Sequence, residues 1–157
     1  MSELIKQSSM LNAMTVDVED YFHVSAFEKV ITPADWKSCQ PTVDYNTRAI
    51  LDLFAKHNTK GTFFILGWVA EAFPELIAEI AKQGHEIASH GMNHRRASTQ
   101  SRAELKEDIQ TSIHLLEDIS GNKVLGYRAP SFSIGKNNEW AFELLAELGI
   151  VYSSSTY

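Results

Sequence analysis

Two histidines four residues apart, His90 and His94, are the clearest candidates for chemistry in this sequence. They follow residues 85–89, which are expected to form a strand, and Gly91 between them lets the chain turn. Neutral imidazole is a favoured ligand of zinc and related ions. The spacing alone is not specific, because two loop histidines that bind nothing can stand equally close in a sequence. Carboxylates at a neighbouring strand end make a metal role the better interpretation.

Three carboxylates near the N-terminus, Asp17, Glu19 and Asp20, could supply that ligand. Such a cluster is often only a solvated acidic turn. Asp17, however, lies in residues 13–18, which have the character of a buried strand, where a carboxylate without a metal ion or an arginine is unfavourable. One carboxylate would complete a His-His-carboxylate site with positions open for water, and another would act as a general base.

Apolar periodicity predicts the elements that must position these residues. The expected strands are residues 13–18, 61–66, 85–89, 125–128 and 150–152. The expected helices are residues 46–58, 74–84, 101–121 and 139–148. A capping box formed by Ser101 and Glu104 marks the start of the third helix. Residues 21–41 show no clear period and are expected to form a long loop.

Strict alternation of strands and helices predicts an α/β fold with a parallel sheet covered by helices. Ligand sites in such folds form at the carboxyl ends of the strands, where the acidic cluster, the two histidines and residues 128–131 are all expected. The pattern leaves open whether the sheet is open or closed into a barrel. We expect one domain, residues 13–157, after an N-terminal extension of residues 1–12. Because the chain ends on an expected strand without a covering helix, we also expect this domain to be incomplete at its C-terminus.

Composition narrows the class of protein. The chain has 157 residues, of which 44% are hydrophobic, and its formal net charge is −6, with no basic run longer than Arg95–Arg96, so we expect no nucleic-acid partner. A single cysteine, Cys39, excludes an intramolecular disulfide. The sequence shows no signal peptide and no apolar run long enough to span a membrane, so a cytoplasmic location is expected.

Three segments taken together, residues 14–20, 89–94 and 127–131, resemble the first three motifs of the polysaccharide deacetylase family, also called the NodB homology domain. The first segment is similar to a D-V-E-D variant found in a subgroup associated with bacterial exopolysaccharide synthesis. The resemblance implies a distorted (β/α) barrel of fewer than eight strands. It also implies a divalent metal ion, usually zinc, held by one carboxylate and two histidines.

The resemblance assigns a role to each matching residue. Asp17 matches the catalytic base, and His90 and His94 match the imidazole ligands. The carboxylate ligand stays open between Glu19 and Asp20, because strand periodicity favours the former and a turn of the chain would present the latter.

Two further residues match the third motif. Arg128 matches an arginine that orients the base, although an arginine near a proline is more often part of a loop salt bridge. The backbone N–H of Ser131 matches an oxyanion donor, at a position where the family often has tyrosine. The family's histidine general acid belongs to a later motif, beyond Tyr157, and His23 is a weak candidate to replace it.

The expected function is that of a metal-dependent hydrolase that removes N-acetyl groups from amino sugars of a bacterial polysaccharide or its precursor. One alternative is hydrolysis of other non-peptide C–N bonds, as in allantoinase-like enzymes. Another is a carbohydrate-binding remnant without catalysis. Trp68 and Trp140 could line a sugar site, but packing in the core is the favoured interpretation for both.

Overall fold

Five short strands lie in the part of the chain that the structure describes, and β-branched and aromatic residues dominate the first two of them. The computed structural model describes residues 12–156, so residues 1–11 of the expected extension, together with Tyr157, lie outside it. The strands are β1 (Thr15–Val18), β2 (Thr62–Ile65), β3 (Glu86–Ser89), β4 (Gly126–Tyr127) and β5 (Tyr152–Ser153).

All strand pairs are parallel, and the strands lie in the sheet in chain order from β1 to β5. A doubly wound sheet reverses its strand order at a switch point, whereas a barrel wall keeps chain order. The predicted α/β fold is confirmed, and the strand order is that of a segment of a barrel.

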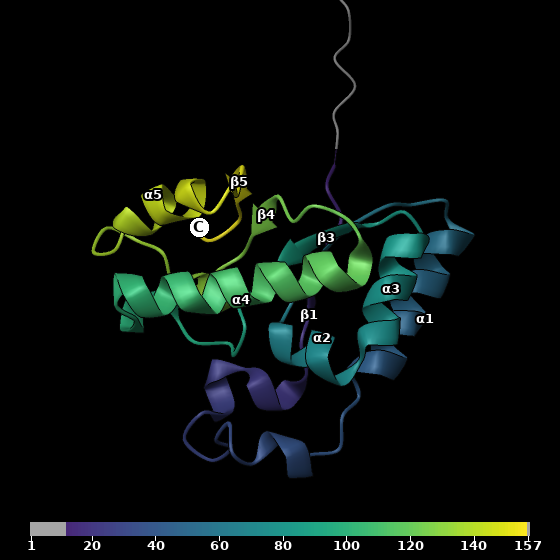
Figure 1. The fold of residues 1–157 in the computed structure, drawn as a ribbon. Helices are drawn as coiled ribbons and strands as arrows, with labels where there is room; N and C mark the ends of the chain where they lie inside the picture. The colour runs from purple at the N-terminus through teal and green to yellow at the C-terminus, as the bar shows by residue number, and fades with distance from the viewer. Residues whose placement is uncertain (1–11, 157) are drawn as a thin grey trace, which may run out of the picture.

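The helices are α1 (Val43–Lys56), α2 (Gly67–Ala72), α3 (Pro74–Lys82), α4 (Arg102–Ser120) and α5 (Trp140–Glu147). Figure 1 shows α4 crossing in front of the sheet, with α1 and α3 at one end and α5 at the other. The periodicity predicts four of these helices within a few residues. Helix α2 is missed, because its six residues are too few to show a helical period before Pro74 opens α3.

Helix α4 matters most for the site, because it packs against β3, which precedes the two histidines. Its predicted capping box is present: the Ser101 side chain accepts from the Glu104 backbone, and the Glu104 side chain accepts from the Ser101 N–H. At the other end Gly121 adopts a φ of 69°, which ends the helix. The buried apolar face of α4 is Leu105, Ile109, Ile113 and Leu116.

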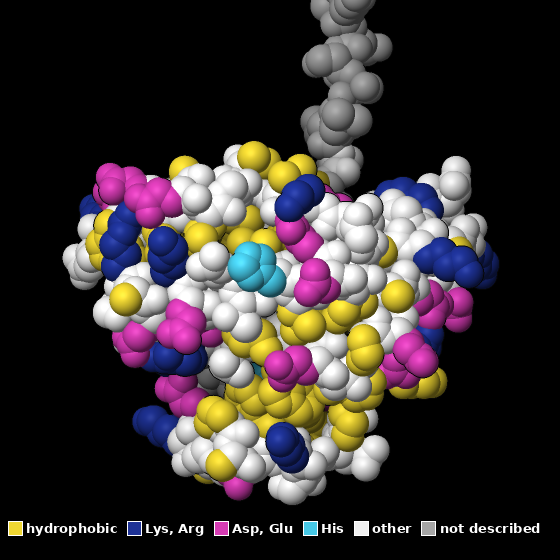
Figure 2. Space-filling view, viewed as in Figure 1, with side chains coloured by type: hydrophobic (Ala, Val, Ile, Leu, Met, Phe, Trp, Pro, Cys, Tyr) yellow, Lys and Arg dark blue, Asp and Glu magenta, His cyan; other side chains and the backbone are white. Residues whose placement is uncertain are grey.

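Residues 21–41, called here the 21–41 segment, form the predicted long loop, which contains three single turns of 3-10 helix. The segment lies below the carboxyl ends of the strands in Figure 1. A cluster of rings fixes it: His23 packs edge-on against Phe22, Trp36 and Trp68, with ring centroids 4.3–4.8 Å apart. In Figure 2 hydrophobic side chains gather where this segment meets the body of the molecule.

Trp68 and Trp140, which could either line a sugar site or pack in the core, both pack against other side chains. Trp68 contacts Phe22 and Trp36 edge-on, and Trp140 is partly buried against the main core. Neither lines the pocket described below. Among residues 12–156 there is no helix with the length and apolar character that crossing a membrane requires.

Candidate metal centre

The carboxyl ends of β1 and β3 bring one carboxylate and two imidazoles together. Glu19, His90 and His94 each offer a ligand atom, and these atoms lie within 4.8 Å of one another. Oε2 of Glu19 is 2.8 Å from Nε2 of His94 and 3.9 Å from Nε2 of His90. The two histidine nitrogens therefore converge on a single carboxylate oxygen.

Burial sets the protonation of this group. His90 is 2% exposed, and burial lowers its pKa despite the nearby carboxylates of Asp17 and Glu19, so its imidazole is neutral at pH 7. Burial also acts to raise the pKa of Glu19, but the close contact with His94 and the electrostatic effect of His94 and His90 outweigh it and lower that pKa. An ionised carboxylate beside neutral imidazole is the form in which these groups bind metal.

The donor set fits a divalent cation. Two nitrogens and one oxygen are ligand types that zinc accepts, and three protein ligands leave room for water or substrate. Oε2 of Glu19 is buried and forms no hydrogen bond within residues 12–156. Nδ1 of His90 donates to the backbone carbonyl of Arg128 at 2.7 Å, which leaves the lone pair of Nε2 facing Glu19.

Asp20, the second carboxylate proposed as a ligand, lies elsewhere. Its side chain accepts from the backbone N–H groups of Thr42 and Val43 at 2.6 and 2.8 Å and from the Thr42 hydroxyl at 2.9 Å. It also accepts from the N–H of Tyr21 at 3.0 Å. Both oxygens are used in joining the 21–41 segment to the start of α1, and Asp20 is not part of the metal-ligand cluster. The chain leaves the strand after Val18 in a way that presents Glu19 to the histidines.

Asp17, which is partly buried, has an arginine partner. Nη1 of Arg128 donates to Oδ1 of Asp17. Arg128 is fixed in turn: Nη2 donates to Ser154 at 2.9 Å and to Thr15 at 3.2 Å, and the guanidinium lies 4.0 Å from the centroid of the Phe64 ring. The resemblance implies this pairing, and it is present.

A pocket of about 250 Å³ joins these groups. Its lining comprises Asp17, Glu19, Val24, Ser25, Ala26, His90, His94, Ala129, Ser131 and Phe132. Ser131 has a φ of 55°, and its hydroxyl is 2.8 Å from that of Ser25. Sequence reasoning misses Val24, Ser25 and Ala26, because no periodicity or motif marks this part of the loop.

His23, the weak candidate for a general acid, lies outside this pocket. Its Nδ1 accepts from the N–H of Asp20 at 2.8 Å, and its ring is enclosed by the aromatic cluster of the 21–41 segment. Burial lowers the pKa of His23 to about 4, so it carries no proton to give at pH 7. His23 therefore has a packing role in place of the acid role.

Comparisons with known proteins find relatives of this chain. Residues 38–153 match the sequence profile of a family described as polysaccharide deacetylase. The chain is 35% identical over 98 residues to a peptidoglycan-N-acetylglucosamine deacetylase of Bacillus cereus, covering 62% of the chain and 36% of that relative. It is also 35% identical over 108 residues to a chitooligosaccharide deacetylase of a Bradyrhizobium species, covering 69% of the chain and 49% of that relative.

The fold has a solved counterpart. A Mycobacterium smegmatis protein described as a polysaccharide deacetylase superposes with a TM-score of 0.76 at 29% identity, over 91% of the chain and 50% of that protein. The chain thus spans between about a third and a half of the length of these relatives. His90, His94, Arg128 and Ser131 fall inside the range that matches the profile, and the acidic cluster precedes it.

Proposed function

The chain belongs to the polysaccharide deacetylase family, and on this basis we propose that it is a metal-dependent hydrolase that removes N-acetyl groups from amino sugars of a bacterial polysaccharide or its precursor. The observation that carries the proposal is the convergence of Glu19, His90 and His94 beside the Asp17–Arg128 pair in one pocket. The B. cereus and Bradyrhizobium relatives are named for deacetylation of peptidoglycan and of chitooligosaccharide, respectively, which supports an N-acetylated glycan as the substrate class. The D-V-E-D form of residues 17–20 favours an exopolysaccharide among such glycans.

Glu19, His90 and His94 would hold the ion, and zinc suits their oxygen and nitrogen donors. When bound, such an ion lowers the pKa of water at the site to roughly 7 and polarises a carbonyl. The carbonyl of Arg128 keeps His90 in the tautomer that this role needs.

Asp17 would take the proton of the attacking water. Arg128 fixes the orientation of the Asp17 carboxylate, because the guanidinium is itself held by Ser154, Thr15 and the Phe64 ring. A base held in this way is preorganised, so little reorganisation is needed as the proton moves.

The backbone N–H of Ser131 would stabilise the charge that develops on the acetamide oxygen. Its left-handed backbone, with φ 55°, places it on the rim of the pocket, and the hydroxyl contact with Ser25 holds it there. One preorganised oxyanion donor typically contributes about 10²–10³-fold in rate. The titratable side chains of the described pocket are Asp17, Glu19, His90 and His94. Our proposal gives each of these a role as base or ligand, and the acid for the leaving amine would then belong to the later motif that the resemblance implies.

The test is a substrate comparison with the zinc-loaded chain. We expect acetate and a free amine to be released from N-acetylated chitooligosaccharides, and no ring opening of cyclic amides such as allantoin. Preference for the cyclic amide would instead favour the allantoinase-like alternative. Stoichiometric zinc binding with no turnover of either substrate, under long incubation, would favour a carbohydrate-binding protein.

A further inference from the structure

The turn that carries the two histidines, residues 90–94, contains backbone that has to be held in place. Gly91 has a φ of 77° and His94 a φ of 50°. A left-handed conformation is unfavourable for a residue with a side chain and persists only where its surroundings fix it. His94 is also a candidate ligand, so whatever fixes this turn also fixes the ligand geometry.

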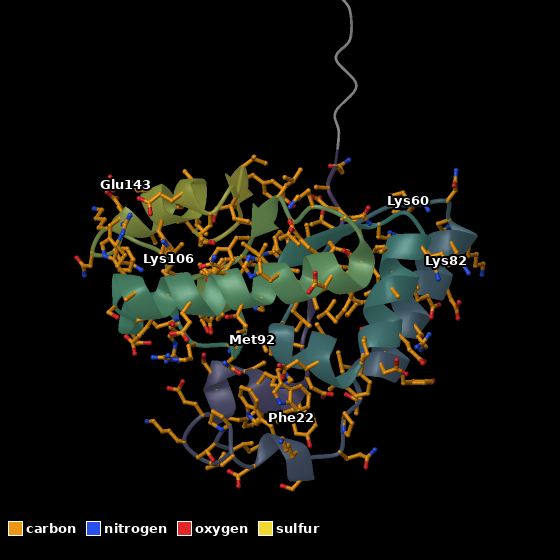
Figure 3. The ribbon with its side chains drawn as sticks, viewed as in Figure 1. Phe22, Lys60, Lys82, Met92, Lys106 and Glu143 are labelled. Carbon is orange, nitrogen blue, oxygen red and sulfur yellow. The ribbon has the colours of Figure 1, made fainter. Side chains whose placement is uncertain are left out.

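Helix α2 holds one side of the turn. The first two N–H groups of this helix, from Gly67 and Trp68, donate to the carbonyls of Gly91 and Met92 at 2.8 and 3.0 Å. Gly67 makes this approach possible, because a Cβ there would lie 2.2 Å from the sulfur of Met92. Figure 3 shows Met92 just below α4 in this view.

Helix α4 holds the other side through Asp108. Oδ2 of Asp108 accepts from the N–H of Met92 at 2.9 Å, and the N–H of Asn93 also donates to this carboxylate. One helical turn further on, the hydroxyl of Ser112 lies 2.9 Å from that of Ser89, whose oxygen accepts from the N–H of Gly91 at 3.0 Å.

Asp108 is an unusual group to find in this place. Its residue is 8% exposed, and no lysine or arginine forms an ion pair with it within residues 12–156. A buried carboxylate is unfavourable unless hydrogen bonds or nearby charges compensate it, and here the N–H groups of Met92 and Asn93 do so, with Arg95 near enough to act on its charge. The carboxylate has two effects here: it accepts from two adjacent N–H groups, and its negative charge interacts with His94.

We infer that Asp108 is a positioning residue for the metal centre, acting through the backbone of Met92 and Asn93 to hold His90 and His94 in ligand geometry. This inference rests on the proposed function, because it assumes that the two histidines bind an ion. It adds a residue from α4 to the three ligands and couples the docking of that helix to metal affinity. Gly91 belongs to the same arrangement, because a Cβ at that position would lie 2.7 Å from Oδ2 of Asp108, too close for the carboxylate to keep its place.

The test compares Asp108→Asn with Glu107→Gln, a matched carboxylate-to-amide change at the exposed neighbouring position of the same helix. Asparagine keeps the shape but replaces two acceptor oxygens with one and removes the negative charge. Zinc affinity, measured by competition with a chelator, should fall about 10–100-fold in Asp108→Asn, as is typical when an outer partner of a ligand is lost. Glu107→Gln should bind zinc as the unaltered chain does.

Two further readouts separate positioning from general stability. The d–d absorption of the cobalt-loaded protein should change in Asp108→Asn, and amide exchange at Met92 and Asn93 should quicken in the metal-free protein, whose melting temperature should fall by only a few degrees. Unchanged zinc affinity in Asp108→Asn, alongside lost binding in His94→Ala, would overturn the inference and leave the proposed function standing. Global unfolding of Asp108→Asn would also overturn it, because Asp108 would then serve the fold as a whole. If His94→Ala itself retained zinc, the proposed function would fail first.

Discussion

Glu19 and Asp20 are adjacent carboxylates with different tasks. Strand periodicity places Glu19 on the same side as Asp17, and that is the acid found with the histidines. Asp20 faces the other way and accepts the N–H groups of Thr42 and Val43. The sequence leaves the choice open, because the point at which a chain leaves a strand depends on tertiary contacts. The bonds to residues 42 and 43 are such contacts, and no local pattern reports them.

This difference predicts opposite results for two matched substitutions. Glu19→Gln should lose zinc, because a neutral amide is a poor replacement for a carboxylate ligand. Asp20→Asn should keep zinc but lower the free energy of unfolding by about 1–3 kcal/mol, because buried N–H groups lose an ionised acceptor. Mass spectrometry of dialysed protein and urea unfolding measure the two effects. Zinc loss in Asp20→Asn with retention in Glu19→Gln would reverse the assignment.

Asp17 lines the pocket and is the proposed base, so its substitution has a different expected result. Asp17→Asn should retain zinc and lower the rate of deacetylation by about 10²–10⁴-fold, since an amide cannot accept the proton. Asp52→Asn, at an exposed position of α1, is the control and should leave both quantities unchanged. Loss of zinc in Asp17→Asn would mean that Asp17 is a ligand. Steady-state kinetics together with metal analysis distinguish these outcomes.

At the level of elements, α4 and the 21–41 segment differ in how far the sequence predicts them. Helix α4 has a local start signal at Ser101, a regular apolar face and a glycine stop, so its bounds follow from sequence. The 21–41 segment has no such local sequence signals. Its position depends on the ring cluster around His23 and on the bonds of Asp20, which join residues far apart in the chain. A loop could be expected there, but its contribution of Ser25 to the pocket could not.

The ring cluster predicts a pH dependence of stability. The pKa of His23 is about 4 in the folded chain and ordinarily about 6.5, because burial opposes the charged form. The unfolded chain therefore binds more protons between these values, so the stability contributed by neutral His23 is complete above pH 6.5 and is lost as the pH falls toward 4. Between pH 7 and pH 4.5 this loss should be about 2–3 kcal/mol.

Urea unfolding of the unaltered chain and of His23→Gln, each at pH 7 and pH 4.5, measures that contribution. The glutamine variant should be less stable at pH 7 and should lose less stability on acidification, by the same 2–3 kcal/mol. The control is His57→Gln, at the exposed end of α1, which should lose as much stability between pH 7 and pH 4.5 as the unaltered chain does. An equal pH dependence in His23→Gln and the unaltered chain would show that His23 titrates normally.

For the whole molecule, the strand order explains why three distant segments meet. Because β1 to β5 lie side by side in chain order and all run parallel, their carboxyl ends share one rim. Alternation of strands and helices was sufficient to predict this rim, and with it the meeting of Asp17, His90 and Arg128. Alternation could not show whether the sheet is open or part of a barrel. That distinction rests on the pairing of the strands in chain order, which only the structure displays.

The contents of the rim predict how the chain should discriminate between leaving groups. The described pocket holds the proposed base and the candidate metal cluster, and our proposal assigns all of its titratable groups to those two roles. An amine leaves only after it is protonated, whereas an activated phenolate leaves as the anion. Lack of a positioned acid typically costs about 10²–10⁴-fold. With zinc bound, the chain should therefore hydrolyse 4-nitrophenyl acetate far faster than an N-acetylated chitooligosaccharide, and Asp17→Asn should suppress both reactions.

Rates of nitrophenolate and free-amine release, with the metal-free protein as the blank, measure the two reactions. Comparable rates on ester and amide would show that a group within these 157 residues protonates the amine. Ester hydrolysis that survives Asp17→Asn would show that the reaction takes place outside this pocket.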